Sequence, residues 1–327
     1  MSRSPAIPRR TLLTVSAGAA AALLLPAIPA SRAADFVTIG SGHAGGSFYP
    51  IGAAVANAID SALPDGRVQV QQTGGSHENI QLVSRGRADL GLALADALSM
   101  AYNGTDPQRY PEPIPNLRGI AAIFPSYVHL IVRADSGIKS LADLRGRKIT
   151  VGAPGGGTES NARAILKAAG LSFDDLGRVE FLSGDDTGDA MRNRRIDGFF
   201  LSTGLGASAI RELETGVKLQ AVPIPAEVVA KIGDPAYISA PMAEGTYGIE
   251  GLPTESVVIW TQLFCDEKVP SERVQTYLTA IFAELGTFRS AHASLADFSL
   301  ERATSGMPIP FHDGAKAFFA SRGITVG

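Results

Sequence analysis

The feature that most constrains the fold of this 327-residue chain is an internal repeat of a strand, a glycine-rich loop and a helix. Residues 37–40 (VTIG) precede the first loop, and residues 149–152 (ITVG) precede the second. In each copy an Asp follows the Gly that ends the strand, 49 residues on at Asp89 and 45 residues on at Asp197. This matching order predicts two related α/β lobes, with chance similarity among β-α-β units as the alternative.

Apolar runs of strand length recur between helical patterns, which predicts an α/β fold with two mostly parallel sheets and a ligand cleft between the lobes. The expected strands are residues 36–40, 68–72, 90–94, 120–124, 128–133, 149–152, 179–182, 198–201, 219–224 and 257–264. After residue 252 the repeat stops, and an amphipathic helix that opens at Pro270 is expected to return to the first lobe. Lobe 1 is then discontinuous, with residues 34–130 and 253–327, and lobe 2 spans residues 131–252.

The first 33 residues have the pattern of an export signal. A basic start with Arg9 and Arg10 precedes an apolar run over residues 12–25, which is too short for a membrane span and suits a signal peptide. Small residues before position 34 fit a signal peptidase, so we expect residues 1–33 to be removed. The Arg pair favours the twin-arginine route, with the general secretory route as the alternative. Either route predicts a periplasmic protein.

Charge and cysteine content bear on the partners of the protein and on the role of its single Cys. Without the signal, 25 basic and 32 acidic residues remain, a net charge of about −7. The basic residues are scattered rather than clustered, so no nucleic-acid partner is expected. The single Cys265 lies in an apolar run, which favours a buried structural thiol.

Four loops at the expected carboxyl ends of strands are rich in Gly, Ser, Thr or Asp: residues 40–50, 73–76, 153–158 and 183–186. In open parallel sheets ligands bind beyond these strand ends, where helix N-termini present free backbone N–H groups. Ser76 and Thr158 are expected to cap the helices that follow. Each loop alone fits a plain capped turn. Together the four helix starts predict a site for a carboxylate or another small anion.

Enzyme and nucleotide motifs are weak or missing in the sequence. Gly40, Gly42 and Gly45 match G-x-G-x-x-G, but no acidic residue stands at a strand end near residue 65 to bind a ribose. The third loop lacks the Lys of a P-loop. The five histidines show no metal-binding spacing, and no G-x-S-x-G motif occurs. We therefore expect a protein that is not an enzyme and uses no cofactor or metal.

Three aspartates are candidates for special roles. Asp89 and Asp197 occupy equivalent repeat positions at strand starts, so a structural role is expected for both. Asp96, just past the end of a strand, is a better candidate for the cleft. It could receive an ammonium or hydroxyl group, with a helix cap as the alternative.

Six segments in this order carry a family resemblance: residues 39–50 (IGSGHAGGSFYP), 73–76 (TGGS) with Asn79, 88–96, 129–144, 155–159 and 310–315 (PFHDGA). Over residues 36–323 the chain resembles the substrate-binding subunits of TRAP transporters of the TAXI type. The stretch at residues 138–144 (IKSLADL) is shared by many bilobal binding proteins, whereas the whole set is far more specific.

The resemblance implies a two-lobed periplasmic binding protein, type II-like, that closes on a small organic acid or amino acid. Family members bind ligands such as glutamate or 2-oxo acids through the first loop, the T-G-G-S loop and a Gly-Thr loop of the second lobe. His43 and Gly206 depart from the family pattern, which bears on the identity of the ligand. Carried over to this chain, the ligand-binding residues are Gly46, Ser47, Tyr49, Ser76, Asn79, Asp96, Gly157, Thr158, Ser160 and Thr203.

The family also implies that the ligand is delivered to the membrane permease subunits of a TRAP transporter, and we expect the binding protein to be a monomer. A binding subunit of an ABC importer and a ligand-sensing periplasmic adaptor are alternatives with the same two lobes. A further alternative is an enzyme on this scaffold, as in deaminase-type tetrapyrrole synthesis. That would need a cytoplasmic location and a reactive Cys, which the export signal and the apolar setting of Cys265 disfavour.

Overall fold

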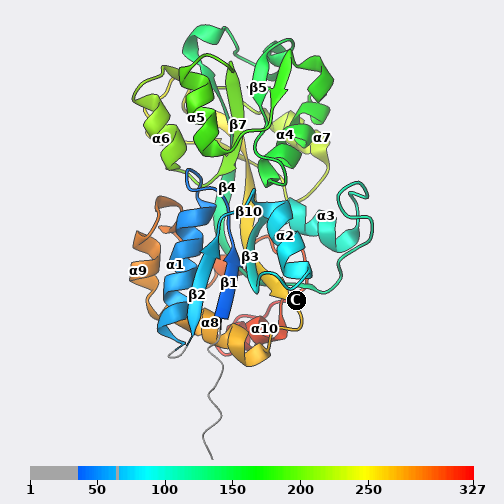
Figure 1. Cartoon of the computed structure of the whole chain (residues 1–327), viewed down its shortest axis with the longest axis vertical. Helices are drawn as coiled ribbons and strands as arrows, with labels where there is room; N and C mark the ends of the chain where they lie inside the picture. Colours follow the sequence, from blue (N-terminus) through cyan, green and yellow to red (C-terminus); the bar gives the residue numbers. More distant parts are fainter. Residues whose placement is uncertain (1–35, 64–65) are drawn as a thin grey trace, which may run out of the picture. The chain divides into compact units, whose positions relative to one another are not determined.

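Strands and helices alternate along residues 36–63 and 66–327, the part of the chain that the computed structural model describes (Figure 1). The strands are β1 (Phe36–Gly40), β2 (Arg67–Gln71), β3 (Leu90–Leu94), β4 (Leu117–Arg133), β5 (Lys148–Thr150), β6 (Arg178–Glu180), β7 (Gly198–Thr203), β8 (Leu219–Ala221), β9 (Ile238–Met242) and β10 (Thr254–Asp266). The α-helices are α1 (Phe48–Ser61), α2 (Ser76–Ser84), α3 (Ala95–Asn103), α4 (Gly157–Ala168), α5 (Gly184–Arg192), α6 (Ser208–Glu214), α7 (Ala226–Ile232), α8 (Ser271–Ala283), α9 (Leu285–Ser290) and α10 (Asp313–Ala320). Short 3-10 helices are η1 (Ala134–Ser136), η2 (Leu141–Leu144), η3 (Phe173–Asp175), η4 (Ala293–Leu295) and η5 (Arg302–Thr304).

The predicted signal peptide over residues 1–33 lies outside the described residues. Within the described part of the chain, no helix has both the length and the apolar character that a bilayer span requires.

The strands form one mixed sheet in the order β2-β1-β3-β10-β4-β7-β5-β6, with β8 paired to β4 and β9 to β10. Pairing is parallel among β1, β2 and β3 and among β5, β6 and β7. In contrast, β4 and β10 are antiparallel to all their neighbours. The predicted α/β fold is confirmed, but the two expected sheets are joined into one.

Two long strands, β4 and β10, join the lobes (Figure 1). Lobe 1 contains β1–β3, α1–α3 and α8–α10, and lobe 2 contains β5–β9 and α4–α7. The register of the β4–β10 pair shifts on both sides of the dipeptide Gln262-Leu263, so the ladder is irregular there. Both predicted lobe divisions lie at these long strands. The division at 130/131 falls within β4, and the division at 252/253 falls directly before β10. In the structure both strands pass from one lobe to the other.

Each lobe has its own apolar core. In lobe 1, Val274 and Leu278 of α8 pack into a cluster with Val37 of β1, so the helix that follows Pro270 contributes to the core of the first lobe. Cys265 is a free, buried thiol in the same cluster, and burial raises its pKa. Lobe 2 is built around separate clusters, one of which contains Ile149 of β5.

The internal repeat is visible in hydrogen bonds as well as topology. Asp89 Oδ2 accepts from the Thr38 backbone N–H at 2.8 Å, and the Asp89 N–H donates to the Thr38 carbonyl. Asp197 makes the same reciprocal pair with Lys148, with a distance of 2.9 Å for the side-chain bond. The two predicted lobes are therefore related, and the structural role expected for both aspartates is confirmed.

Several local predictions need correction. The separate strands expected at 120–124 and 128–133 are one strand, β4, which runs through Pro125. Strand β9 was not expected, because its residues are mostly exposed and it contains Pro241. Ser76 and Thr158 do not cap their helices, since each already lies inside the first turn and the N-cap residues are Gly75 and Gly156.

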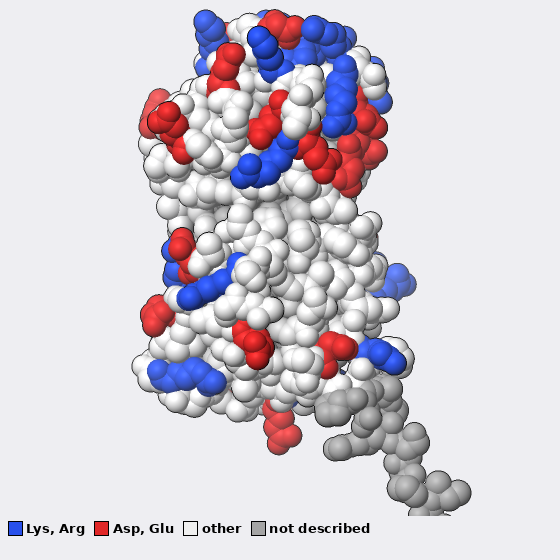
Figure 2. Space-filling model, turned by 90° about the vertical axis from the view of Figure 1, so that its left-hand side faces the viewer, with Lys and Arg blue, Asp and Glu red and all other residues white. Residues whose placement is uncertain are grey.

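The charged surface is uneven on the face that carries α6 and α9 (Figure 2). Lys and Arg gather with Asp and Glu on lobe 2, with both signs interspersed, and a band at the level of the junction is uncharged. Surface charge on this face therefore forms no broad field of one sign near the junction of the lobes.

Candidate functional site

A small pocket lies where loops of both lobes meet. The loops at residues 40–50 and 73–76 form its lobe 1 side, and the first turn of α4 and the end of β7 form its lobe 2 side. Its volume is about 40 Å³. A single water needs roughly 10–15 Å³, so the pocket admits only a few non-hydrogen atoms in this closed arrangement. The lining residues are Gly42, His43, Gly46, Ser47, Phe48, Gly74, Gly75, Ser76, Leu94, Gly157, Thr158, Ser202 and Thr203.

Two larger hollows lie elsewhere. One of about 160 Å³ lies beside Trp260 of β10, and one of about 490 Å³ lies at the Arg133 end of β4. The interlobe pocket is the candidate site, because it lies at the carboxyl ends of the parallel strands and at the starts of α1, α2 and α4.

Ser47, directly before α1, joins the two lobes. Its backbone N–H donates to Thr203 Oγ1 at 3.0 Å, and the Thr203 hydroxyl donates to Ser47 Oγ at 3.0 Å. His292 Nδ1 accepts from the Ser294 N–H, so the neutral ring carries its hydrogen on Nε2, which lies 3.4 Å from Ser47 Oγ. Ser47 Oγ thus accepts twice, and its own hydrogen remains available to a ligand.

Two further pocket hydroxyls also accept a hydrogen bond from the protein and keep their own hydrogen to donate. Ser76 Oγ accepts from the Leu94 N–H at 3.1 Å, and Thr158 Oγ1 accepts from the Ser202 N–H at 3.0 Å. A hydroxyl that accepts through a lone pair keeps one hydrogen to donate. Ser47, Ser76 and Thr158 therefore offer donors to the pocket from both lobes.

The loops of the two lobes approach closely because of glycines. A Cβ at Gly74 would lie 2.5 Å from the Pro154 carbonyl oxygen, and one at Gly156 would lie 2.6 Å from the Gly74 carbonyl oxygen. The Gly155 carbonyl accepts from the first N–H groups of α2, at His77 and Glu78, both at 3.1 Å. Lobe 2 thus occupies part of the helix start that was expected to face the ligand.

The predicted site residues divide into two groups. Gly46, Ser47, Ser76, Gly157, Thr158 and Thr203 line the pocket, whereas Tyr49, Asn79, Asp96 and Ser160 do not. The buried Asn79 amide donates to the backbone carbonyls of Ser41 and Leu92 at 2.6 and 2.7 Å. Asn79 therefore holds the first loop against β3, because both of its amide hydrogens are used within the protein.

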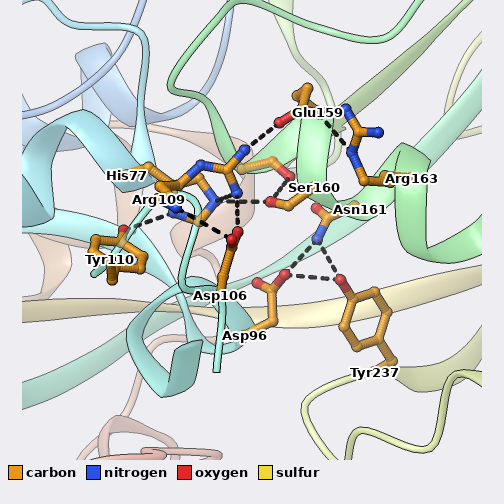
Figure 3. Close-up of polar contacts among 11 residues, drawn as sticks. His77, Asp96, Asp106, Arg109, Tyr110, Glu159, Ser160, Asn161, Arg163 and Tyr237 are labelled. Atoms are coloured by element: carbon orange, nitrogen blue, oxygen red, sulfur yellow. Dashed lines mark hydrogen bonds and ion pairs between the residues drawn. The ribbon is translucent and has the colours of Figure 1, made fainter. Parts of the chain in front are cut away.

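Asp96 lies in a buried contact between the lobes (Figure 3). Its Oδ2 accepts from the Tyr237 hydroxyl at 2.8 Å and from the Asn161 amide at 2.7 Å, and Asn161 comes from α4. Asp96 was expected to receive an ammonium or hydroxyl group, and the hydroxyl that it receives belongs to the protein. Burial raises the pKa of Asp96 to about 6, with the hydrogen bond from Tyr237 opposing.

Ser160 belongs to a second buried contact, in which His77 lies between two hydroxyls (Figure 3). His77 Nε2 lies 2.9 Å from Ser160 Oγ, and Nδ1 lies 2.7 Å from the Tyr110 hydroxyl oxygen. Burial lowers the pKa of His77 to about 3, and the charge of Arg109 acts in the same direction. His77 is therefore neutral and connects α2 to α4.

An ion pair closes the outer side of this region. Arg109 of lobe 1 donates to Glu159 Oε2 of α4 at 2.6 Å and to Asp106 at 2.8 Å. Glu159 is buried, and it also accepts from Arg163 within the same helix. The contacts of Asp96, His77 and Arg109 form what we call the interlobe polar cluster (Figure 3).

The pocket itself contains little charge. Among its described lining residues there is no Asp, Glu, Lys or Arg, and His43 is the ionisable side chain. The fourth predicted loop does not line the pocket: Ser183 caps α5, and Gly184 lies against the His43 ring. Within the described residues no cluster of three or more His, Cys, Asp or Glu could hold a metal ion.

A model of the NMT1-like family matches residues 39–323. The chain belongs to the NMT1-like family. Known structures share the fold of this NMT1-like chain at low identity. MatC from Rhodopseudomonas palustris, with bound malate, is 13% identical, with a TM-score of 0.61 over 88% of this chain and 97% of that one. The periplasmic binding protein BugD is 15% identical, with a TM-score of 0.54 over 80% of this chain and 87% of that one.

A third similar structure is an ancestral arginine-binding protein bound to arginine. It is 15% identical, with a TM-score of 0.50 over 81% of this chain and 98% of that one. At such identities these likenesses establish the fold alone. The predicted two-lobed, type II-like fold of this NMT1-like chain is thereby confirmed.

Sequence reasoning missed part of the site in this NMT1-like chain. His43 and Ser202 line the pocket, yet His43 was noted only as a departure from a family pattern. Asn161 and Tyr237, the partners of Asp96, were not predicted at all. They are 65 and 141 residues from Asp96 in the sequence and belong to the other lobe, so no local pattern marks them.

Proposed function

We propose that this NMT1-like chain is a periplasmic solute-binding protein that captures a small organic acid between its lobes. The observation that carries the proposal is the set of three pocket hydroxyls, on Ser47, Ser76 and Thr158, that each accept from the protein and keep a hydrogen to donate. The starts of α1 and α4 add backbone N–H groups without intrahelical partners. Donors in a lining that itself contains no acid favour an anion.

An acid without an ammonium group fits this lining better than an amino acid does. The described lining residues include no carboxylate that could pair with an ammonium. Asp96, the predicted candidate, uses Oδ2 on Tyr237 and Asn161 instead. Dicarboxylic and 2-oxo acids therefore fit best, and the similar MatC structure contains malate, a ligand of this class.

We also propose that the protein is not an enzyme. The two Ser–His contacts near the pocket are arranged so that neither His activates its Ser. His292 directs an N–H toward Ser47, and Ser160 donates its hydrogen to the Gly157 carbonyl at 3.0 Å. A His that acts as a general base must instead accept the hydroxyl hydrogen.

Delivery to a TRAP-type permease rests on the TAXI resemblance of the loops at residues 39–50 and 73–76. The fold is equally compatible with an ABC importer or a ligand-sensing adaptor. Gene neighbourhood separates these routes: a fused TRAP permease gene next to this one supports the proposal. An ATPase gene or a histidine kinase gene in that place contradicts it.

The ligand class is tested by calorimetry on the mature protein with malate, 2-oxoglutarate and glutamate. We expect malate or 2-oxoglutarate to bind more tightly than glutamate, because the pocket has no partner for an ammonium. If an aliphatic sulfonate or a vitamin binds and none of these three acids does, the carboxylic-acid proposal is wrong.

A matched pair of variants locates the binding site. Thr158→Val removes one pocket hydroxyl and should weaken binding by about tenfold, because one hydrogen bond to a charged ligand contributes roughly 1.5 kcal/mol. Thr276→Val makes the same change on α8, where the hydroxyl donates to the Glu272 carbonyl away from the pocket. Equal affinities of the two variants would place the ligand elsewhere.

A further inference from the structure

His43 is exceptional among the five histidines of the chain. It lines the pocket, its Nδ1 is buried, and no described residue forms a hydrogen bond with its ring. A buried imidazole nitrogen without a partner costs free energy, so its position needs a reason. The other four rings are all hydrogen-bonded: His77 to Tyr110 and Ser160, His129 to backbone carbonyls and Tyr247, His292 to the Ser294 N–H, and His312 to the Gly314 N–H.

Glycines from both lobes leave the space that the His43 ring occupies. A Cβ at Gly46 of lobe 1 would lie 2.9 Å from His43 Cε1, and a Cβ at Gly184 of lobe 2 would lie 2.4 Å from the same atom. Any other residue at either position would displace the ring. Since Gly184 opens α5 in lobe 2, residues of both lobes enclose the ring.

The electrostatic setting of the ring is simple. The charged groups that face it are Asp185 and Asp186, in the first turn of α5. Neither its own loop nor the rest of the pocket lining supplies another charge. Burial lowers the pKa of His43 below its usual value, and the two aspartates only partly oppose this. The ring is therefore neutral at neutral pH before an anion arrives.

An anionic ligand would favour protonation of the His43 ring. A carboxylate in the pocket places a negative charge and a hydrogen-bond acceptor beside the ring, and both favour the protonated imidazole. The proton comes from solvent, so each ligand bound takes up as much as one proton. No bond other than this N–H forms or breaks.

We propose that His43 is a specificity-determining residue that donates a hydrogen bond from its protonated ring to the ligand's carboxylate and thereby couples ligand capture to proton uptake. The proposal rests on the proposed function, because it requires an anionic ligand in this pocket. It goes beyond that function by giving the site a pH dependence and a named donor.

The test is calorimetry with malate and with 2-oxoglutarate, in pairs of buffers that differ in ionisation enthalpy. For the wild type, the buffer dependence should report proton uptake approaching one per ligand, and affinity should fall by up to about tenfold per pH unit as the pH rises above the lowered pKa of the free His43 ring. For His43→Gln, which keeps an N–H donor but cannot be charged, both the proton uptake and the pH dependence should disappear. The control His312→Asn keeps a capping acceptor at the start of α10 and should behave as wild type.

Different outcomes contradict different proposals. If wild-type protein binds one of these acids but His43→Gln retains the proton uptake, the role of His43 is wrong and the proposed function stands. If neither these two acids nor glutamate binds the wild type while an aliphatic sulfonate or a vitamin does, both proposals are wrong. Ring NMR gives a second measurement: the resonance that is missing in His43→Gln should titrate at higher pH in the presence of ligand, and an unchanged titration refutes the coupling.

Discussion

Asp96 provides the sharpest test of the free-energy cost of the buried charge between the lobes. Its carboxylate is fully buried between α3 and α4, and burial raises its pKa from 3.8 to about 6. Because the folded-state pKa lies above the unfolded value, the folded protein binds this proton more tightly than the unfolded chain does. The contribution of Asp96 to stability is therefore fully present below about pH 4 and is lost as the pH rises to about 6.

The size of the effect follows from the shift. About two pH units at 1.36 kcal/mol each correspond to roughly 3 kcal/mol between the two protonation states. Asp96→Asn removes the charge, while the amide oxygen can still accept from Tyr237 and Asn161. The free energy of unfolding of Asp96→Asn, minus that of the wild type, should thus rise by about 3 kcal/mol between about pH 4 and about pH 7.5.

Urea unfolding followed by circular dichroism measures this difference. Hydrogen-bond changes that do not depend on pH cancel when the same pair of proteins is compared at two pH values. Asp313→Asn is the control, because it removes a carboxylate whose side chain is 83% exposed on α10. The reasoning is refuted if the difference between Asp96→Asn and the wild type is the same at both pH values.

Two further predictions concern the interlobe ion pair and the repeat. Arg109→Met should weaken ligand affinity by about fivefold and raise the ligand-free radius of gyration in X-ray scattering, since it removes a contact of roughly 1 kcal/mol across the lobes. Arg163→Met breaks a bond to the same Glu159 within α4 and should leave the radius unchanged; equal effects would exclude a closing role for Arg109. Asp89→Ala should lower the free energy of unfolding by about 2 kcal/mol, because it loses a charged bond to a backbone N–H. Asp197→Ala should lower it by at least as much, because Asp197 makes the equivalent bond and also pairs with Arg133; a clearly smaller loss in urea unfolding would contradict the equivalence.

Strand positions were predictable wherever apolar runs stand between turns. Strand β3 matches the predicted range 90–94 because all five residues are buried, which leaves a continuous apolar run. The sequence predicts separate strands at 120–124 and 128–133; Pro125, which cannot donate to a ladder, lies between these ranges. The strand continues there because the pairing with β10 becomes irregular close by, with a register shift after Thr261.

Site residues were predictable only to the level of loops. Parallel strand order brings the loops at 40–50, 73–76 and 153–158 to one edge, and all three line the pocket. The direction of individual side chains was not predictable. Asn79 and Ser160 turn into the protein, because each finds buried hydrogen-bond partners there.

The closed arrangement is a balance between opposing contributions from the protein alone. The bonds of Arg109 to Glu159 and of Ser47 to Thr203 favour closure without any ligand. Burial of an ionised Asp96 and of the unpaired His43 ring opposes it at neutral pH. A pocket of about 40 Å³ must open to admit a solute. If no contribution opposed closure, the open state would rarely be populated and the ligand would bind slowly. A ligand whose charge stabilises the His43 ring offsets one opposing contribution, and only such differential interactions shift the population toward the closed state.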